Sequence, residues 1–358
     1  MTTTQTTDRG SAALASARES VAARATALDE LRTDVREDLA MLGRAGLFDA
    51  ALQESGTADL VQVIDTIAAE SLAVGFSTWA HAMTLLYLQR ASAGLREEYV
   101  DALRTGSRVG VTAMAPALKQ LAGLGDMPVI ADESGGMVRV TGSIPWASNL
   151  FDNAVIVLPA RSISGGTYVV AVDAHTTGLT INPAPALMAL GATASTSVNL
   201  HDVEVPRTHI ISRDLGEFVK RFRPMLLLLQ TAFALGVGRA SLDAARQFTG
   251  PLTAPFADDL AALSRQMTKL GDLLYAVGGE PPHRPIKDII QLRLDTGAAA
   301  VSATRLEFTL AGASGYRSGT ATNRRFREAA FLPIQAPSEG QLRRELQLFH
   351  QQSQRCAR

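Results

Sequence analysis

A block of short, β-branched segments between two long helical blocks constrains the fold of this chain most. Between residues 107 and 212, runs rich in Val, Ile and Thr alternate with turn residues. No stretch between these runs reads as a crossover helix, so we expect a mainly antiparallel sandwich or barrel. The strands that we expect are Val109–Met114, Met137–Thr141, Asn153–Pro159, Thr167–Val172, Leu179–Ile181 and Ser197–Val205.

The residues on either side of this block have helical patterns. Residues 1–10 are small and polar, and we expect them to be disordered. Residues 11–106 repeat apolar side chains at spacings of three and four, which predicts an all-helical domain. Residues 213–358 predict a C-terminal four-helix bundle after the central antiparallel β-domain (107–212), so the expected fold class is α+β, mainly α. Its four helices are expected at Glu217–Phe248, Ala257–Val277, Arg284–Ala313 and Asn323 to the C-terminus.

Composition excludes several classes of function. The 358 residues include 34 basic and 35 acidic side chains, a formal net charge of −1, so we expect no nucleic-acid partner. The one cysteine, Cys356, allows no internal disulfide, and we expect no metal site. The N-terminus lacks the pattern of a secretory signal, and the apolar runs are too short for a membrane span. We therefore expect a soluble, cytoplasmic protein.

The stretch Thr141–Asn149 contains one of the two tryptophans of this chain, which is poor in aromatic residues. We place Trp146 and Ser148 at the end of a strand, where side chains two residues apart face the same way. An aromatic plane and a small hydroxyl would then share one surface. The alternative is a buried tryptophan that plugs the end of the β-domain.

Four stretches occur in the same order as motifs of a known family. With the helical, β and helical order of domains, they make the chain from about Leu39 to Ser338 resemble the acyl-CoA dehydrogenase superfamily. The stretches are Thr141–Asn149, Gly191–Ser197 with His201–Pro206, Leu235–Ala244, and Gly312–Tyr316 with Arg324–Ala329.

The resemblance implies a flavin cofactor. It would place Trp146 against the face of the isoalloxazine ring and the Ser148 hydroxyl at its N5 edge. Val111 and Thr112 would contact the pyrimidine side of the ring, Thr112 by analogy with the threonine of the family's "TEP" motif.

The resemblance also implies an oligomer. Gly312 and Gly315 would supply backbone for the cofactor of a neighbouring subunit, so we expect a homodimer or homotetramer. Tight helix packing is the alternative explanation for both glycines.

The chain departs from the family where an acyl-CoA dehydrogenase needs a carboxylate to remove the substrate α-proton. The usual position of this base corresponds to Ala336, and a less common position corresponds to Leu226. Neither side chain can accept a proton. Glu339 lies three residues beyond Ala336 and is the candidate for a relocated base, although an exposed acid at a helix start is the simpler interpretation.

Two further departures concern the cofactor and the active-site histidine. The arginine that meets the FAD pyrophosphate in the family is missing from Thr249–Pro255, which leaves room for FMN or a loosely held flavin. The resemblance then favours the flavin-dependent monooxygenases, which receive reduced flavin from a separate reductase. Those enzymes often carry a histidine near the position of Gln335. The best remaining candidate is His81, and a hydrogen-bonded core histidine is the alternative.

Three hypotheses for function follow. The first is a monooxygenase or oxidase that uses reduced flavin, FMN or FAD, and O2 on a small organic substrate, with Ser148 and His81 as catalytic residues. The second is an acyl-CoA dehydrogenase whose base is Glu339. The third is a flavin-free, non-catalytic protein with the same fold.

Overall fold

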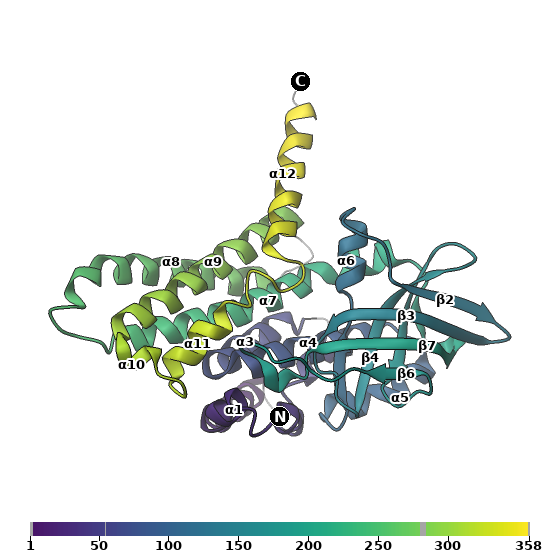
Figure 1. Ribbon diagram of the computed structural model, residues 1–358, viewed down its shortest axis with the longest axis horizontal. Helices are drawn as coiled ribbons and strands as arrows, with labels where there is room; N and C mark the ends of the chain where they lie inside the picture. The colour runs from purple at the N-terminus through teal and green to yellow at the C-terminus, as the bar shows by residue number, and fades with distance from the viewer. Residues whose placement is uncertain (1–2, 54, 280–283, 357–358) are drawn as a thin grey trace.

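The computed structural model describes residues 3–53, 55–279 and 284–356. Five helices precede the sheet (Figure 1). The first begins at Thr3, so most of the stretch 1–10 that we expected to be disordered is helical, while residues 1–2 lie outside the described residues. The helices are α1 (Thr3–Asp29), α2 (Arg36–Arg44), α3 (Thr57–Glu70), α4 (Leu72–Leu88) and α5 (Ala93–Arg104).

Eight strands then form one continuous hydrogen-bonded sheet in the order β6-β7-β3-β2-β4-β5-β8, with β1 paired to β4. The expected mainly antiparallel character is confirmed, but β1 and β2 both run parallel to β4, so the sheet is mixed. A short helix between them, α6 (Ala115–Leu121), was not anticipated. The strands are β1 (Val109–Thr112), β2 (Val129–Ser134), β3 (Met137–Ala147), β4 (Ala154–Ser162), β5 (Thr167–Asp173), β6 (Leu179–Ile181), β7 (Thr196–Pro206) and β8 (Ile210–Ser212).

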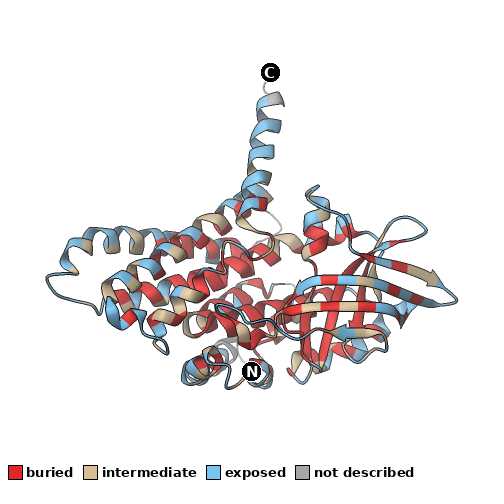
Figure 2. Cartoon of the chain, in the orientation of Figure 1, coloured by how far each residue is buried: buried red, intermediate tan, exposed pale blue. Residues whose placement is uncertain are grey.

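Both faces of β4 and β5 are buried, and alternate residues enter different cores (Figure 2). Val155 and Val157 on β4 join the large core that the helices share. Ile156 and Leu158 point to the other face, into a smaller core made mostly by strand residues. This period of two explains why these strands are continuously apolar in sequence.

The C-terminal part contains three long helices and a divided fourth. The helix expected to run from Asn323 to the C-terminus is two helices, because Pro333 and Pro337 interrupt it with residues that lack a backbone N–H. The last helix projects away from the body and is exposed along its outer length (Figures 1 and 2). The helices are α7 (Leu215–Ala245), α8 (Ala257–Gly278), α9 (Ile286–Ala311), α10 (Ala313–Tyr316), α11 (Ala321–Ala329) and α12 (Glu339–Cys356).

The long helix α7 is the centre of the helical core. It is long and apolar enough to cross a membrane, but its apolar window is mostly buried against other helices, so it is a core helix. Asp214 caps its first turn by accepting a hydrogen bond from the Glu217 N–H at 3.0 Å. Gly236 allows the close approach of α3, because a Cβ there would lie 2.2 Å from the Asp65 carbonyl oxygen.

Candidate functional site

The end of β3 presents an open aromatic surface. Trp146 is 55% exposed, so it does not plug the β-domain. The register of β3 against β7 shifts between Ile144 and Ala147, which are both buried, and Pro145 and Trp146 face outward together. The strand ends at Ala147, and Ser148 follows it half-buried.

The Ser148 hydroxyl belongs to a chain of three hydroxyl groups. It lies 2.6 Å from the Ser195 hydroxyl, which lies 2.7 Å from the Thr193 hydroxyl. Thr193 donates its proton to the Leu190 carbonyl oxygen at 2.8 Å. Because each hydroxyl has one proton, Ser195 must donate to Thr193, and Ser148 must donate to Ser195. Ser148 therefore offers only lone pairs to a ligand.

Asn149 brings the ends of β1 and β3 together. Its side-chain amide donates to the Ser77 carbonyl oxygen on α4 at 3.0 Å and to the Gly110 carbonyl oxygen on β1 at 3.1 Å. The residue adopts a φ of 66°, a left-handed conformation that asparagine tolerates better than most residues. Through this residue the stretch that carries Trp146 and Ser148 is hydrogen-bonded to β1, which carries Thr112, and we call these two joined strand ends the sheet edge.

The two candidates on β1 point in different directions. The Val111 side chain is fully buried in the smaller core, so only its backbone could meet a ligand. The Thr112 hydroxyl is partly exposed and lies 3.3 Å from the Tyr87 hydroxyl on α4. Burial raises the pKa of Tyr87 well above its ordinary value, which keeps this phenol neutral and able to donate.

His81 lies in the core on α4 and is fully buried. Its Nδ1 accepts a hydrogen bond from the Gly110 N–H at 3.0 Å, so Nε2 carries the proton and donates to the Leu103 carbonyl oxygen at 2.8 Å. Burial lowers the pKa of His81 to about 4, which keeps the ring neutral. With both ring nitrogens engaged, the geometry favours the core alternative over a catalytic role.

Gly312 and Gly315 lie far from the sheet edge. Figure 1 shows α10, which begins just after Gly312, at the opposite end of the molecule from β3. Gly312 ends α9 with a φ of 58°. Gly315 is buried, and a Cβ there would lie 2.9 Å from the Ala311 Cβ, which supports tight packing as its role. A single chain does not bring these glycines to Trp146.

Both positions that correspond to the family's base carry apolar side chains, and the carbonyl oxygens of both residues accept hydrogen bonds from other side chains. Leu226 on α7 is 4% exposed, and its carbonyl oxygen accepts a hydrogen bond from the Trp79 indole at 3.3 Å. Ala336 lies between α11 and α12, and its carbonyl oxygen accepts from the Gln230 amide at 2.9 Å and from the Gln335 amide at 3.0 Å. Two carboxamides thus converge where the family places a carboxylate.

These carboxamides leave polar atoms unpaired. Gln230 and Gln335 are nearly fully buried, and their amide oxygens have no hydrogen-bond partner within the described residues. A carboxamide oxygen is a weak base, so it can accept a hydrogen bond from a ligand but cannot remove a carbon-bound proton. The arrangement therefore fits a polar ligand group better than base catalysis.

Glu339 lies on the other side of this segment. Its carboxylate lines a cavity against α9, next to Arg293 and Gly297, and it pairs with Arg343 at 2.7 Å. The Ala336 carbonyl instead faces Gln230 on α7. The carboxylate of Glu339 is thus directed toward α9, whereas the usual base position lies against α7.

The sequence analysis missed several residues that build this site. Thr193 and Ser195 lie in the stretch Gly191–Ser197, which served only as part of the resemblance. Gln230 and Tyr87 lie on helices whose partners are distant in the chain, so no local pattern marks them. Across the part of the chain that the structure describes, no group of three or more His, Cys, Asp or Glu side chains could hold a metal ion.

Comparison with solved structures identifies the fold. No protein-family model and no curated protein matches the chain. A glutaryl-coenzyme A dehydrogenase in complex with glutaryl-CoA matches with a TM-score of 0.85 and 18% identity over 95% of this chain and 94% of that one. Butyryl-CoA dehydrogenase from Megasphaera elsdenii gives 0.84 and 18% over 96% and 97%.

A monooxygenase has the same fold. Dibenzothiophene monooxygenase from Paenibacillus sp. A11-2 matches with a TM-score of 0.72 and 16% identity over 94% of this chain and 95% of that one. The chain therefore has the acyl-CoA dehydrogenase fold, which confirms the expected order of helical, β and helical parts. At these identities the matches establish the fold and leave the activity to the residues of the site.

Proposed function

We propose that the protein is a flavin-dependent oxidoreductase of the monooxygenase or oxidase type, acting on a small organic substrate with O2. The observation that carries this proposal is the absence of a carboxylate at Ala336 and Leu226, together with the direction of Glu339 toward α9. The α-proton of a saturated thioester leaves only to a positioned base. Oxygen chemistry has no such requirement.

The sheet edge has side chains suited to a flavin. Trp146 offers an exposed aromatic face for stacking, and the partly exposed Thr112 hydroxyl can hydrogen-bond to the ring edge. A flavin bound here would supply hydride or oxygen chemistry at N5 and its neighbouring carbon. The residues themselves bind and orient the ring.

The direction of the hydroxyl chain favours reduced flavin. A reduced flavin carries a hydrogen on N5, whereas an oxidised flavin has a lone pair there. Ser148 can only accept, because its own proton is committed to Ser195. On the proposal that this hydroxyl meets N5, it pairs with the reduced form and leaves the oxidised form without a donor. This supports a protein that takes up reduced flavin from a separate reductase.

The proposal also includes the oligomeric state of the protein and the identity of the flavin. We infer a homodimer or homotetramer, because α10, which follows Gly312, lies at the end of the molecule opposite β3, which carries Trp146, so that Gly312 could meet only the cofactor of another subunit. The segment Thr249–Pro255 lacks an arginine for a pyrophosphate, which favours FMN or a loosely held FAD. A cytoplasmic location fits a protein supplied by a soluble reductase.

The test is a titration of the purified protein with FMN and FAD, each in the oxidised and the reduced state. We expect the reduced form to bind more tightly. Addition of a flavin reductase, NADH and O2 should then give substrate-dependent oxygen consumption. If neither FMN nor FAD binds in either redox state, the proposal is contradicted and the flavin-free hypothesis is favoured.

A further inference from the structure

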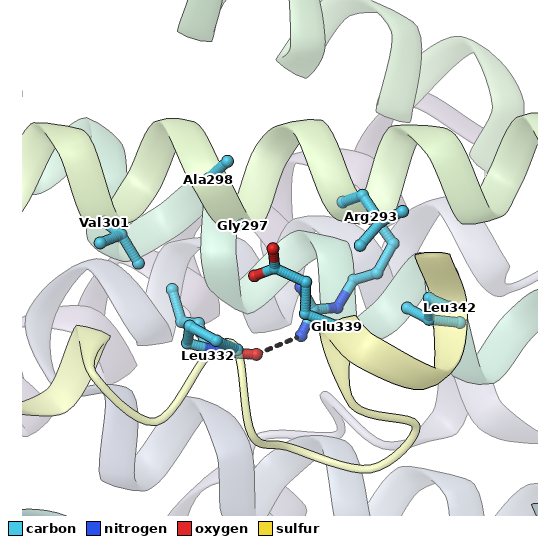
Figure 3. A pocket seen from close by; sticks show the side chains of 9 residues that line it. Arg293, Gly297, Ala298, Val301, Leu332, Glu339 and Leu342 are labelled. Carbon is cyan, nitrogen blue, oxygen red and sulfur yellow. Dashed lines mark hydrogen bonds between the residues drawn. The ribbon is translucent and has the colours of Figure 1, made fainter. Parts of the chain in front are cut away.

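The cavity that Glu339 lines lies away from the sheet edge, between α9 and the segment that joins α11 to α12 (Figure 3). Its volume is about 220 Å³. Its walls are mostly aliphatic, and they include one guanidinium group. The residues that form these walls include Leu294, Ala298, Val301, Leu332, Pro333 and Leu342.

The guanidinium belongs to Arg293, which is only 4% exposed. Its Nη2 donates to the Leu332 carbonyl oxygen at 3.0 Å, and its Nε has no hydrogen-bond partner among the residues that the structure describes. None of the described carboxylates lies within ion-pair distance of it. Burial lowers the pKa of Arg293 to about 10, an effect that the nearby charge of Glu339 partly offsets. A buried, unpaired cation is costly, and an anion would compensate it.

The local sequence of α9 makes room for this group. Gly297 lies one turn after Arg293, and a Cβ at Gly297 would lie 2.7 Å from the Arg293 Nη1. Any other residue would force the guanidinium to move. Glycine weakens the interior of a helix, so its presence here has a structural use: it lets the guanidinium lie along the helix at the cavity wall.

We propose that this cavity is a binding site for a small aliphatic carboxylate. A planar guanidinium matches the two oxygens of a carboxylate. The aliphatic walls suit a short hydrocarbon tail, which an inorganic anion lacks. The cavity is large enough for a chain of a few carbons.

Glu339 limits the affinity of this site. Its carboxylate lines the same cavity, and Arg343 holds it from the solvent side at 2.7 Å. It repels an incoming anion, and it compensates the charge of Arg293 only from beyond ion-pair distance. Removal of this charge should therefore tighten carboxylate binding, which is the opposite of what a purely structural change would do.

The cavity shares one chain segment with Ala336, the position that corresponds to the family's base. Arg293 holds the segment through the Leu332 carbonyl, and Gln230 holds it through the Ala336 carbonyl from the side of α7. A carboxylate bound to Arg293 would thus lie against the segment that carries Ala336. The proposal does not rest on flavin binding, because each group that forms the cavity belongs to α9, α12 or the segment between α11 and α12.

The experiment is isothermal titration of the full-length protein with butyrate, with chloride and phosphate at the same ionic strength as comparison. We expect saturable butyrate binding that neither inorganic anion reproduces. The Arg293→Gln variant should weaken it by roughly 10- to 100-fold, the value of a lost hydrogen bond to a charged group. The Glu339→Gln variant should strengthen it.

Two variants separate binding in this cavity from effects on folding. Ala298 is exposed at the cavity wall, so Ala298→Leu should block butyrate while leaving the melting temperature unchanged. Arg305 is exposed on the same helix outside the cavity, and Arg305→Gln should bind butyrate as the wild type does. The proposal fails if wild type shows no saturable butyrate binding, if phosphate or chloride binds equally well, or if Ala298→Leu binds butyrate unchanged.

Discussion

The two tryptophans mark two regions of the molecule with opposite construction. Trp146 ends β3 on an open surface and is 55% exposed. Trp79 lies on α4 and is 5% exposed, its ring stacked on Phe76 at 5.4 Å and edge-on to Phe233 at 6.2 Å. Its indole N–H donates to the carbonyl oxygen of Leu226, one of the two residues at the positions of the missing base.

This difference in exposure indicates that the region around Trp146, and not the region around Trp79, can contact a flavin. The sheet edge leaves an aromatic face and a hydroxyl acceptor available. The helical side, which includes a position that corresponds to the family's catalytic base, is packed with aliphatic and aromatic side chains around Leu226.

The largest effect should come from Trp79→Ala. Loss of a buried indole leaves a cavity and removes the hydrogen bond from the indole to the Leu226 carbonyl, which should lower the free energy of unfolding by about 3–5 kcal/mol. Urea denaturation measures it, with Trp79→Phe as a milder control. A loss below about 1 kcal/mol would mean that the region around Trp79 is not the packed core that we describe.

Next in size is the pH dependence contributed by His81. Its folded-state pKa is about 4, below the ordinary 6.5, so the unfolded chain takes up a proton that the folded chain refuses. The contribution of His81 to the free energy of unfolding should fall as the pH decreases from 6.5 to 4, and the loss should reach roughly 3 kcal/mol at pH 4.

The His81→Gln variant should lack this loss. Asp38, whose pKa burial raises to about 6, acts in the opposite direction in both proteins, so the difference between them isolates His81. Unfolding free energies at pH 7, 5.5 and 4 provide the comparison. Parallel curves for the two proteins would show that His81 titrates normally and is accessible.

Trp146→Ala tests the open region directly. We expect flavin affinity to weaken by about 5- to 30-fold, or about 1–2 kcal/mol of stacking. Because the side chain is exposed, the free energy of unfolding should change by less than about 0.5 kcal/mol. Flavin titration and urea denaturation of the same preparation measure both. Unchanged flavin binding with a less stable protein would show that Trp146 serves packing.

The smallest effect should come from Ser195→Ala. Without Ser195 as an acceptor, Ser148 can turn its proton toward N5 and favour oxidised flavin. The flavin midpoint potential should then fall by about 10–30 mV, from one hydrogen bond of about 0.5–1.5 kcal/mol. Ser143→Ala, exposed on the same strand as Trp146, is the control. A rise in potential would show that Ser148 donates in the wild type.

The sequence predicted the order of elements because periodicity is local. The strand at Leu179–Ile181 was predicted with its observed bounds, and the change from helix to strand after Arg104 follows the pattern of side chains. The sequence also contains the two prolines that interrupt the last helix, Pro333 and Pro337, but we predicted one continuous helix across them. Strands β2 and β8 were missed because short, partly polar strands carry little pattern.

The site was less accessible to prediction because its geometry depends on distant pairs. Ser148 and Ser195 are 47 residues apart, and His81 bonds to residues 22 and 29 positions away. The catalytic role predicted for Ser148 stays a prediction. No single-sequence pattern shows that Trp146 is exposed, since that depends on the shift in register between β3 and β7.

This chain lacks a carboxylate at both positions that correspond to the base of an acyl-CoA dehydrogenase, and anaerobic mixing of the flavin-loaded protein with butyryl-CoA tests the consequence. General-base loss costs about 10²–10⁴-fold in rate. We predict that the flavin absorbance of the wild type stays unchanged and that Glu339→Gln behaves identically. Rapid bleaching by the wild type that Glu339→Gln abolishes would contradict the account, because the base would then have moved to Glu339.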